Sequence, residues 1–218
     1  MKYLRRILRI MFGLLLFGFG SYLSIQANVG LAPWEAFQLG IANLIGVKYG
    51  NVSVTVGLII LVASLALKEK VGIGTVLNLI FIGKFVDMFN ALDLVPQMQR
   101  FLPGVGMLLL GLLSVSVGSY FYISGGMGCG PRDALMVALH KRIKGLPVGA
   151  IRGIIEGTVL LIGFLLGSKV GLGTVISVFG ISFLIQGVFH VFRFDVKAVE
   201  HEGFRETWNA IRSREKTQ

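Results

Sequence analysis

The sequence contains one short pattern twice, and each copy interrupts an apolar stretch. The copies read GLAPWEA at 30–36 and GCGPRDA at 128–134, and they lie 98 residues apart. Glycine admits backbone conformations that are closed to other residues, and proline suits the first turn of a helix. An acid in that turn is stabilised by the positive end of the helix dipole. Each copy therefore predicts a break in the chain followed by the start of a new helix.

The chain around these breaks is too apolar for a soluble domain. Of its 218 residues, 54% are hydrophobic and 15% are charged, whereas about a quarter of the residues of a soluble domain are charged. Several apolar runs are long enough to cross a bilayer. We therefore predict an all-α polytopic membrane protein with the breaks at or near membrane depth. The net charge of +10 indicates anionic lipid and not nucleic acid, because the basic residues cluster at the ends of apolar runs.

The apolar runs and the breaks predict eight helical segments in two sets of four. The first set covers about 8–26, 33–46, 52–67 and 71–89, and the second covers about 102–124, 131–143, 148–166 and 170–192. The first segment imitates a signal peptide, but no convincing cleavage site follows, so we interpret it as a retained membrane helix. The second segment of each set is about 21 Å long or less, too short to cross an apolar core of about 30 Å.

A second match between the two sets indicates an internal duplication. KVGIGTV at 70–76 returns as KVGLGTV at 169–175, in the same order relative to the breaks. Such duplications are a common ground plan of transporters.

We predict a single membrane domain, 1–192, made of repeat 1 at about 8–90 and repeat 2 at about 102–192. A basic cytoplasmic tail, 193–218, follows, either as a helix on the membrane surface or as a disordered segment. If the short segments are re-entrant, each repeat has three transmembrane helices plus one short broken helix. The repeats are then inverted, with six spans plus two half-helices. If the short segments cross, eight spans form parallel repeats. Their short length and the positive-inside rule favour six spans, with the N- and C-termini in the cytoplasm.

Glu35 and Asp133 are the first candidates for chemistry. Each acid is explained equally well as a helix cap or as part of a site for a cation, a proton or an amine. The second reading arises because carboxylates within membrane helices tend to face a cavity, an ion path or a partner. Backbone N–H groups at the same helix starts would suit an anion, and Arg132, which takes the place of Trp34, adds a possible anion contact. The candidate solute-binding residues are Gly30, Pro33, Glu35, Gly128, Gly130, Pro131, Arg132 and Asp133.

Arg152 and Glu156 form a second candidate group. They lie four residues apart in an apolar segment, hence on one helix face, and they take the places of Ser53 and Gly57 in the first half. We interpret them either as a structural bridge or as a gating or coupling site.

Catalytic motifs and metal-ligand spacings are absent from the sequence, so we expect no enzymatic activity, no cofactor and no metal. The single cysteine, Cys129, excludes an internal disulfide and a cysteine-based metal cluster.

The paired breaks and the repeated Lys-Val-Gly-x-Gly-Thr-Val segment resemble the YczE/YyaS/YitT family of bacterial integral membrane proteins, and its YczE-like branch in particular. The Gly-x-Gly-Pro-x-Asp pattern of that branch matches 128–133, whereas the first copy has alanine for the second glycine and glutamate for the aspartate. The resemblance covers nearly the whole chain to about residue 192. It implies a bacterial cytoplasmic (inner) membrane protein but little about substrate, because the family is mostly of unestablished function.

We expect a small secondary transporter, a permease or exporter of a small polar or amphiphilic solute, with its site at the paired breaks and proton coupling through Asp133 or Glu35. The alternative is a non-transporting membrane subunit, chaperone or regulator of another membrane system. A chain of 218 residues can need a second copy of itself or a membrane partner to enclose a pathway. The expected partners are thus the solute, the lipid bilayer and such a copy or partner.

Overall fold

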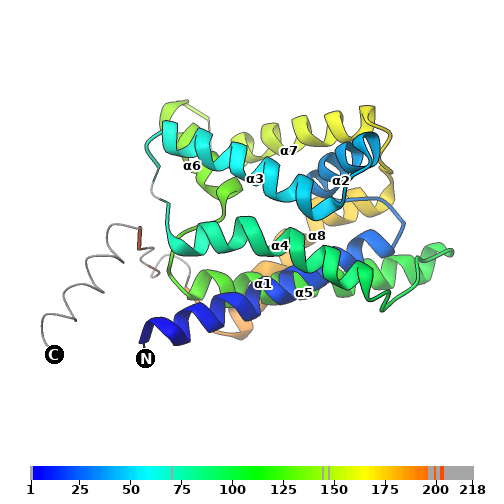
Figure 1. The fold of residues 1–218 in the computed structure, drawn as a ribbon, viewed down its shortest axis with the longest axis horizontal. Helices are drawn as coiled ribbons and strands as arrows, with labels where there is room; N and C mark the ends of the chain where they lie inside the picture. The colour runs from blue at the N-terminus through cyan, green and yellow to red at the C-terminus, as the bar shows by residue number, and fades with distance from the viewer. Residues whose placement is uncertain are drawn as a thin grey trace, which may run out of the picture.

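The structure is a computed structural model that describes residues 2–69, 71–143, 145–146, 148–195, 199 and 202–203. These residues form eight helices and no strand (Figure 1): α1 Lys2–Gln26, α2 Pro33–Ile45, α3 Tyr49–Ala66, α4 Ile73–Ala91, α5 Phe101–Ser124, α6 Pro131–Arg142, α7 Val148–Leu165 and α8 Leu172–Val191. The all-α class is confirmed. The predicted segments agree closely with these helices, although α1 begins earlier than expected, at Lys2, and α3 begins at Tyr49.

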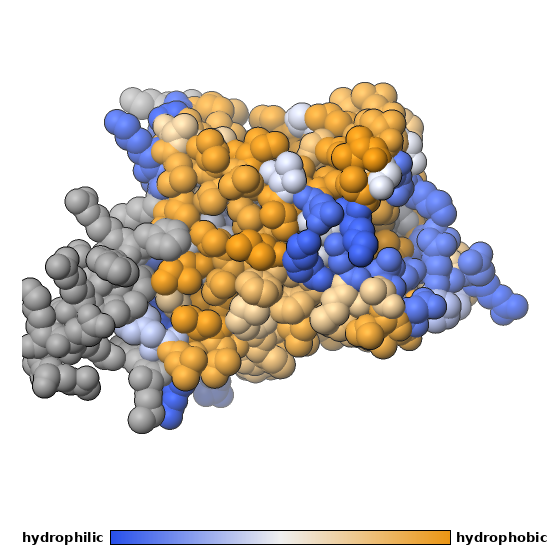
Figure 2. Space-filling model, in the orientation of Figure 1, coloured by the Kyte–Doolittle hydropathy of each residue, from blue (hydrophilic) through white to orange (hydrophobic). Residues whose placement is uncertain are grey.

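Six long helices run lengthwise through the bundle (Figure 1). Five of them, α1, α3, α4, α5 and α8, are long and apolar enough to cross a membrane, and α7 has 18 residues, as α3 does. Hydrophobic residues cover most of the face in Figure 2. An apolar surface of this extent marks a membrane-facing protein. We call the end at which α1 begins the near end, and the opposite end the far end. Helices α1, α4 and α7 run from near to far, and α3, α5 and α8 run back.

The two short helices do not cross the bundle. α2 has 13 residues and α6 has 12, so each is about 20 Å long or less. After α1 and α5 the chain turns back into the bundle in extended conformation, and each short helix then runs outward from the middle. The first turns of α2 and α6 meet at Trp34 and Arg132. The end of α6 lies at the near end, where Lys141 Nζ binds Glu69 Oε2 at 2.9 Å. The fold therefore has six long helices plus two re-entrant half-helices, and α5–α8 run in directions opposite to α1–α4.

Helices α1 and α5 form the most extensive contact in the bundle. They are antiparallel, and glycines bring their backbones together. A Cβ added at Gly13 would lie 2.7 Å from the carbonyl oxygen of Gly118, and one added at Gly111 would lie 2.7 Å from that of Gly20. Small residues allow this close approach between membrane helices, where packing replaces the hydrophobic effect.

The other helices pack around this pair in a largely matching way. α4 packs on α1 as α8 packs on α5, and α2 packs on α7 as α6 packs on α3. The main difference between the halves is that α3 packs along α4 whereas α7 and α8 hardly touch.

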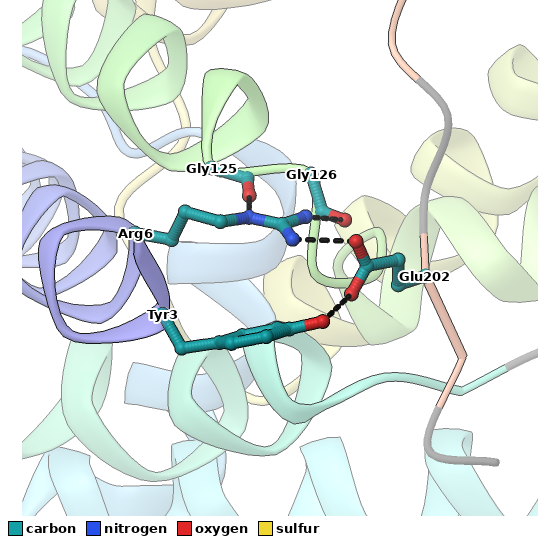
Figure 3. A network of polar contacts seen from close by, with 5 residues as sticks. All are labelled: Tyr3, Arg6, Gly125, Gly126 and Glu202. Atoms are coloured by element: carbon teal, nitrogen blue, oxygen red, sulfur yellow. Dashed lines mark hydrogen bonds and ion pairs between the residues drawn. The ribbon is translucent and has the colours of Figure 1, made fainter. Parts of the chain in front are cut away.

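A polar network closes the near end beside the second break (Figure 3). Arg6 donates from Nε to the carbonyl oxygen of Gly125 at 2.7 Å and from a terminal nitrogen to that of Gly126 at 2.8 Å. Its other terminal nitrogen binds Glu202 Oε1 at 2.5 Å, and the Tyr3 hydroxyl donates to Glu202 Oε2 at 3.4 Å. The start of α1, the second break and a short part of the tail are thus held together. Most of the predicted tail, including its proposed surface helix, lies outside the described residues.

Candidate functional site

The first break is held by the segment that precedes and begins α8. The backbone N–H of Gly173 donates to the carbonyl oxygen of Val29 at 2.9 Å, and that of Leu31 donates to the carbonyl oxygen of Lys169 at 3.0 Å. The Lys169 ammonium in turn donates to Asn28 Oδ1 at 2.6 Å. Extended backbone at membrane depth must find such partners within the protein, because lipid offers none.

The second break is held by the start of α4 in the same way. The backbone N–H of Gly74 donates to the carbonyl oxygen of Met127 at 2.6 Å. The Thr75 hydroxyl donates to the carbonyl oxygen of Cys129 at 2.6 Å. The two KVGxGTV segments therefore have a definite role, because each forms the helix start that holds the opposite half's break.

One glycine in each break is required by both conformation and space. Gly30 has φ +128° and Gly128 has φ +111°, values that L side chains rarely adopt. A Cβ at Gly30 would lie 2.8 Å from the amide nitrogens of Gly171 and Thr174, and one at Gly128 would lie 2.6 Å from the Thr75 hydroxyl oxygen. These two predicted site residues thus have a clear structural function in placing the breaks.

Both half-helices begin with proline and direct free amide groups at the middle of the bundle. Pro33 and Pro131 occupy the start of α2 and α6, and the residues before them, Ala32 and Gly130, are extended and make no side-chain cap. The first N–H groups of a helix have no partner within it and carry partial positive charge. Two positive helix ends therefore point toward a common place.

The two helix starts are joined there by a stack. The guanidinium carbon of Arg132 lies 4.6 Å from the centroid of the Trp34 ring, the geometry of a cation–π interaction. These two residues hold equivalent positions in the two copies of the pattern. Tyr49, Glu35 and Glu156 lie close enough to Arg132 to interact with it electrostatically. The two predicted breaks therefore meet at one place in the bundle.

Two acceptors on α2 are buried and unsatisfied. Glu35 is 8% exposed and Gln38 is 1% exposed, and they lie three residues apart on one face of α2. Glu35 interacts with the Ser21 hydroxyl and the Ala32 backbone. Among the described residues, however, Glu35 Oε2 and Gln38 Oε1 have no hydrogen-bond partner. A buried acceptor without a donor costs about 1–3 kcal/mol, so this pair favours a ligand that donates hydrogen bonds.

The two predicted acids differ in their surroundings. Asp133 is exposed at the start of α6, although it too interacts with Arg132. Glu35 is buried. Only the first break therefore offers an acid within a closed environment.

Arg152 and Glu156 form the predicted bridge. Arg152 Nε binds Glu156 Oε1 at 2.8 Å, with side chains 48% and 21% exposed. Glu156 interacts with Arg132, so this pair continues outward from the central site along α7.

A hollow of about 450 Å³ opens above the first break at the far end, and Asn28, Gly30, Arg100 and Lys169 are among its lining residues. Gly30, although buried, thus lines this hollow, whereas Glu35 does not.

Sequence reasoning missed Gln38 and Tyr49. A single glutamine or tyrosine in an apolar run carries no specific signal. The three-residue spacing from Glu35 to Gln38 was the one available indication, because it places both on one helix face.

The geometry defines a polytopic α-helical membrane protein with two re-entrant half-helices that meet in the bundle. The chain belongs to the family DUF6198, described as a family of unknown function, which it matches over residues 4–190.

Its relatives include YczE of Bacillus subtilis (strain 168), an uncharacterized membrane protein that is 32% identical over 76% of each chain. An uncharacterized protein of Haemophilus influenzae is 33% identical over 81% of this chain and 80% of its own. YyaS of Bacillus subtilis, also uncharacterized, is 25% identical over 76% of this chain and 83% of its own. No solved structure matches the chain. The predicted resemblance to YczE and YyaS is confirmed.

Proposed function

We propose that this protein is a small secondary transporter of the bacterial cytoplasmic membrane that exchanges protons for a small solute bearing a cationic amino group. In this proposal the near end, with both termini, faces the cytoplasm, and the two halves derive from an internal duplication. The observation that carries the proposal is the pair of buried, unsatisfied acceptors, Glu35 Oε2 and Gln38 Oε1, on the half-helix α2 that begins at the junction.

The chemistry of coupling follows from the position of Glu35. Arg132 is a positive neighbour of this carboxylate, but Glu35 Oε2 has no hydrogen-bond partner, and either a proton or the amino group of a solute can provide one. Because both compete for the same oxygen atoms, binding of one displaces the other. Gln38 Oε1 accepts a second hydrogen bond from the amino group, which a lone proton on Glu35 does not supply.

Arg132 complements this site from the second half. Its stack on Trp34 fixes a permanent positive charge beside the carboxylate. That charge limits the affinity for the cationic solute, and a transporter must release its solute as well as bind it. The breaks that precede α2 and α6 resemble the discontinuous helices around which transporters build sites near the bilayer midplane.

The test begins with a ligand-stabilisation screen on purified protein in detergent. Wild type is compared with Glu35→Gln and with Asp133→Asn, the matched acid of the other break. The panel contains alkylamines, quaternary ammonium ions, amino acids and alkyl carboxylates. A ligand at a hundred times its Kd stabilises the folded state by about 2.7 kcal/mol. We expect amines to raise the thermal midpoint of wild type and of Asp133→Asn but not of Glu35→Gln.

Flux in proteoliposomes then completes the test. An amine that stabilises the protein should accumulate in the vesicles in exchange for protons when a proton gradient is imposed. Glu35→Gln should abolish this accumulation. Stabilisation by carboxylates alone, or equal amine binding by Glu35→Gln, would contradict the proposed site. No proton-driven flux, together with a membrane partner that co-purifies in stoichiometric amount, would select the non-transporting subunit instead.

A further inference from the structure

The α3–α4 face and the α7–α8 face hold equivalent sequence positions but differ in packing. In the first half, a Cβ at Gly57 would lie 3.1 Å from Leu79 Cγ, and a Cβ at Gly83 would lie 2.7 Å from that of Ser53. Ser53 is buried, yet its counterpart Arg152 is exposed. The first half is thus closed where the second half is open.

The exposed face of α8 carries polar and aromatic side chains together. Ser182 and Gln186, the counterparts of Gly83 and Asp87, are exposed. Phe179 and Phe183 on the same side are 65% and 73% exposed. A hollow of about 650 Å³ continues this face at the near end, where Gln186, Phe189, His190, Arg193, Phe194 and Asp195 line it.

α7 carries an ion pair at the positions equivalent to the buried Ser53 and Gly57 of α3. Charged side chains within a membrane are costly and almost always face a cavity or a polar partner. The Arg152–Glu156 pair is only partly buried, and Glu156 interacts with Arg132 at the central site. A line of polar groups therefore leads from the outside of the bundle to the stacked Trp34–Arg132 junction.

We propose that the unpacked α7–α8 face is the entrance through which an amphiphilic cation passes between the bilayer and the central site. The cationic head moves along Glu156 toward Glu35, while the apolar part of the solute stays beside Phe179 and Phe183. This inference rests on the proposed function and narrows its solute class to amines with an apolar chain.

The test uses single-cysteine variants in a Cys129→Ser background, reconstituted in lipid nanodiscs. Gly153→Cys reports on the entrance without removing the ion pair, since no atom lies within 4 Å of a Cβ at Gly153. Gly57→Cys is the matched control on the closed face. Leu58→Cys, at a position 52% exposed, is the lipid-facing reference. Labelling by N-dodecylmaleimide from the bilayer is compared with labelling by a sulfonated maleimide from water.

We expect Gly153→Cys to react with the dodecyl reagent at least about tenfold faster than Gly57→Cys, because thiol reactivity depends on access. Dodecyltrimethylammonium should slow the labelling of Gly153→Cys but not of Leu58→Cys. Adding Glu35→Gln should remove this protection. Thermal midpoints establish that each variant is folded, and Glu156→Cys repeats the test at a second position.

Three results would overturn the inference. Labelling of Gly153→Cys and Glu156→Cys no faster than that of Gly57→Cys would show that α8 or a second copy covers the face. Labelling by the sulfonated reagent alone would show a water-filled cleft. If dodecyltrimethylammonium protects Gly153→Cys and Leu58→Cys equally, it only dilutes the reagent in the bilayer and does not bind at the entrance. Since labelling needs no flux, a failure of transport would leave these outcomes readable and would count against the proposed function alone.

Discussion

The two breaks share a backbone conformation but differ in their side chains. In both, a glycine with positive φ packs against the start of a helix from the other half, and a proline opens a short helix. The first break adds a tryptophan and a buried glutamate, whereas the second adds an arginine and an exposed aspartate. The two breaks therefore share a backbone geometry, whereas their side chains at the junction differ and are complementary. A cation from one half lies on an aromatic ring from the other.

Replacing the break glycines should have the largest effect, and a similar one in the two halves. Gly30→Ala and Gly128→Ala each combine a strained φ with contacts below 3 Å. We expect each to lower the free energy of unfolding by about 2–5 kcal/mol. The measurement is the thermal midpoint in detergent. Gly149→Ala, where a Cβ meets nothing within 4 Å, is the control and should change it little. A large loss in only one break would show that the two are not built alike.

Removing the charge of Arg132 should have the next largest effect, and it should depend on the other break. Arg132→Gln leaves the buried Glu35 without its positive neighbour, so we expect a loss of about 2–3 kcal/mol. In the double variant with Glu35→Gln, much of that loss should be recovered, with a coupling energy of about 1–3 kcal/mol. A double-mutant cycle of thermal or denaturant unfolding measures it. Additive effects would mean that the two half-helices do not meet.

Substitutions of Thr75 and Thr174, in the first turns of α4 and α8, should show the smallest difference in stability between the two breaks. Each hydroxyl accepts a hydrogen bond from a glycine N–H three residues earlier. Thr75 also donates to the carbonyl oxygen of Cys129. Thr75→Val should therefore cost about 1 kcal/mol more than Thr174→Val, the net contribution of one hydrogen bond. Equal losses in parallel unfolding measurements would show that this bond does not hold the second break.

Much of the fold follows from local signals in the sequence. Pro33 and Pro131 begin the half-helices where they were predicted to do so, and the short length of the two segments favoured half-helices over a full crossing. The apolar runs predicted the long helices, because every backbone N–H and C=O group within a membrane span must be hydrogen-bonded inside the protein. The ion pair of Arg152 and Glu156 followed from helical spacing alone.

The rest depends on tertiary packing, which spacing does not encode. The stack of Trp34 on Arg132 arises because α2 rests on α7 and α6 rests on α3, contacts between segments far apart in sequence. The sequence did not single out Gln38, because its burial follows from the packing around α2. The open α7–α8 face was not predicted either, although Arg152, Glu156 and Ser182 take the places of the residues that pack α3 on α4.

The glycine contacts between α1 and α5 have a mechanical consequence. The backbones of α1 and α5 are in direct contact, so no layer of side chains between them can slide or repack. The two helices therefore form a rigid pair. If the protein changes conformation, its two halves cannot rotate away from each other along the α1–α5 contact as rigid bodies. Movement must instead be carried by the outer helices, and α7 and α8 lack the mutual contact that α3 and α4 make.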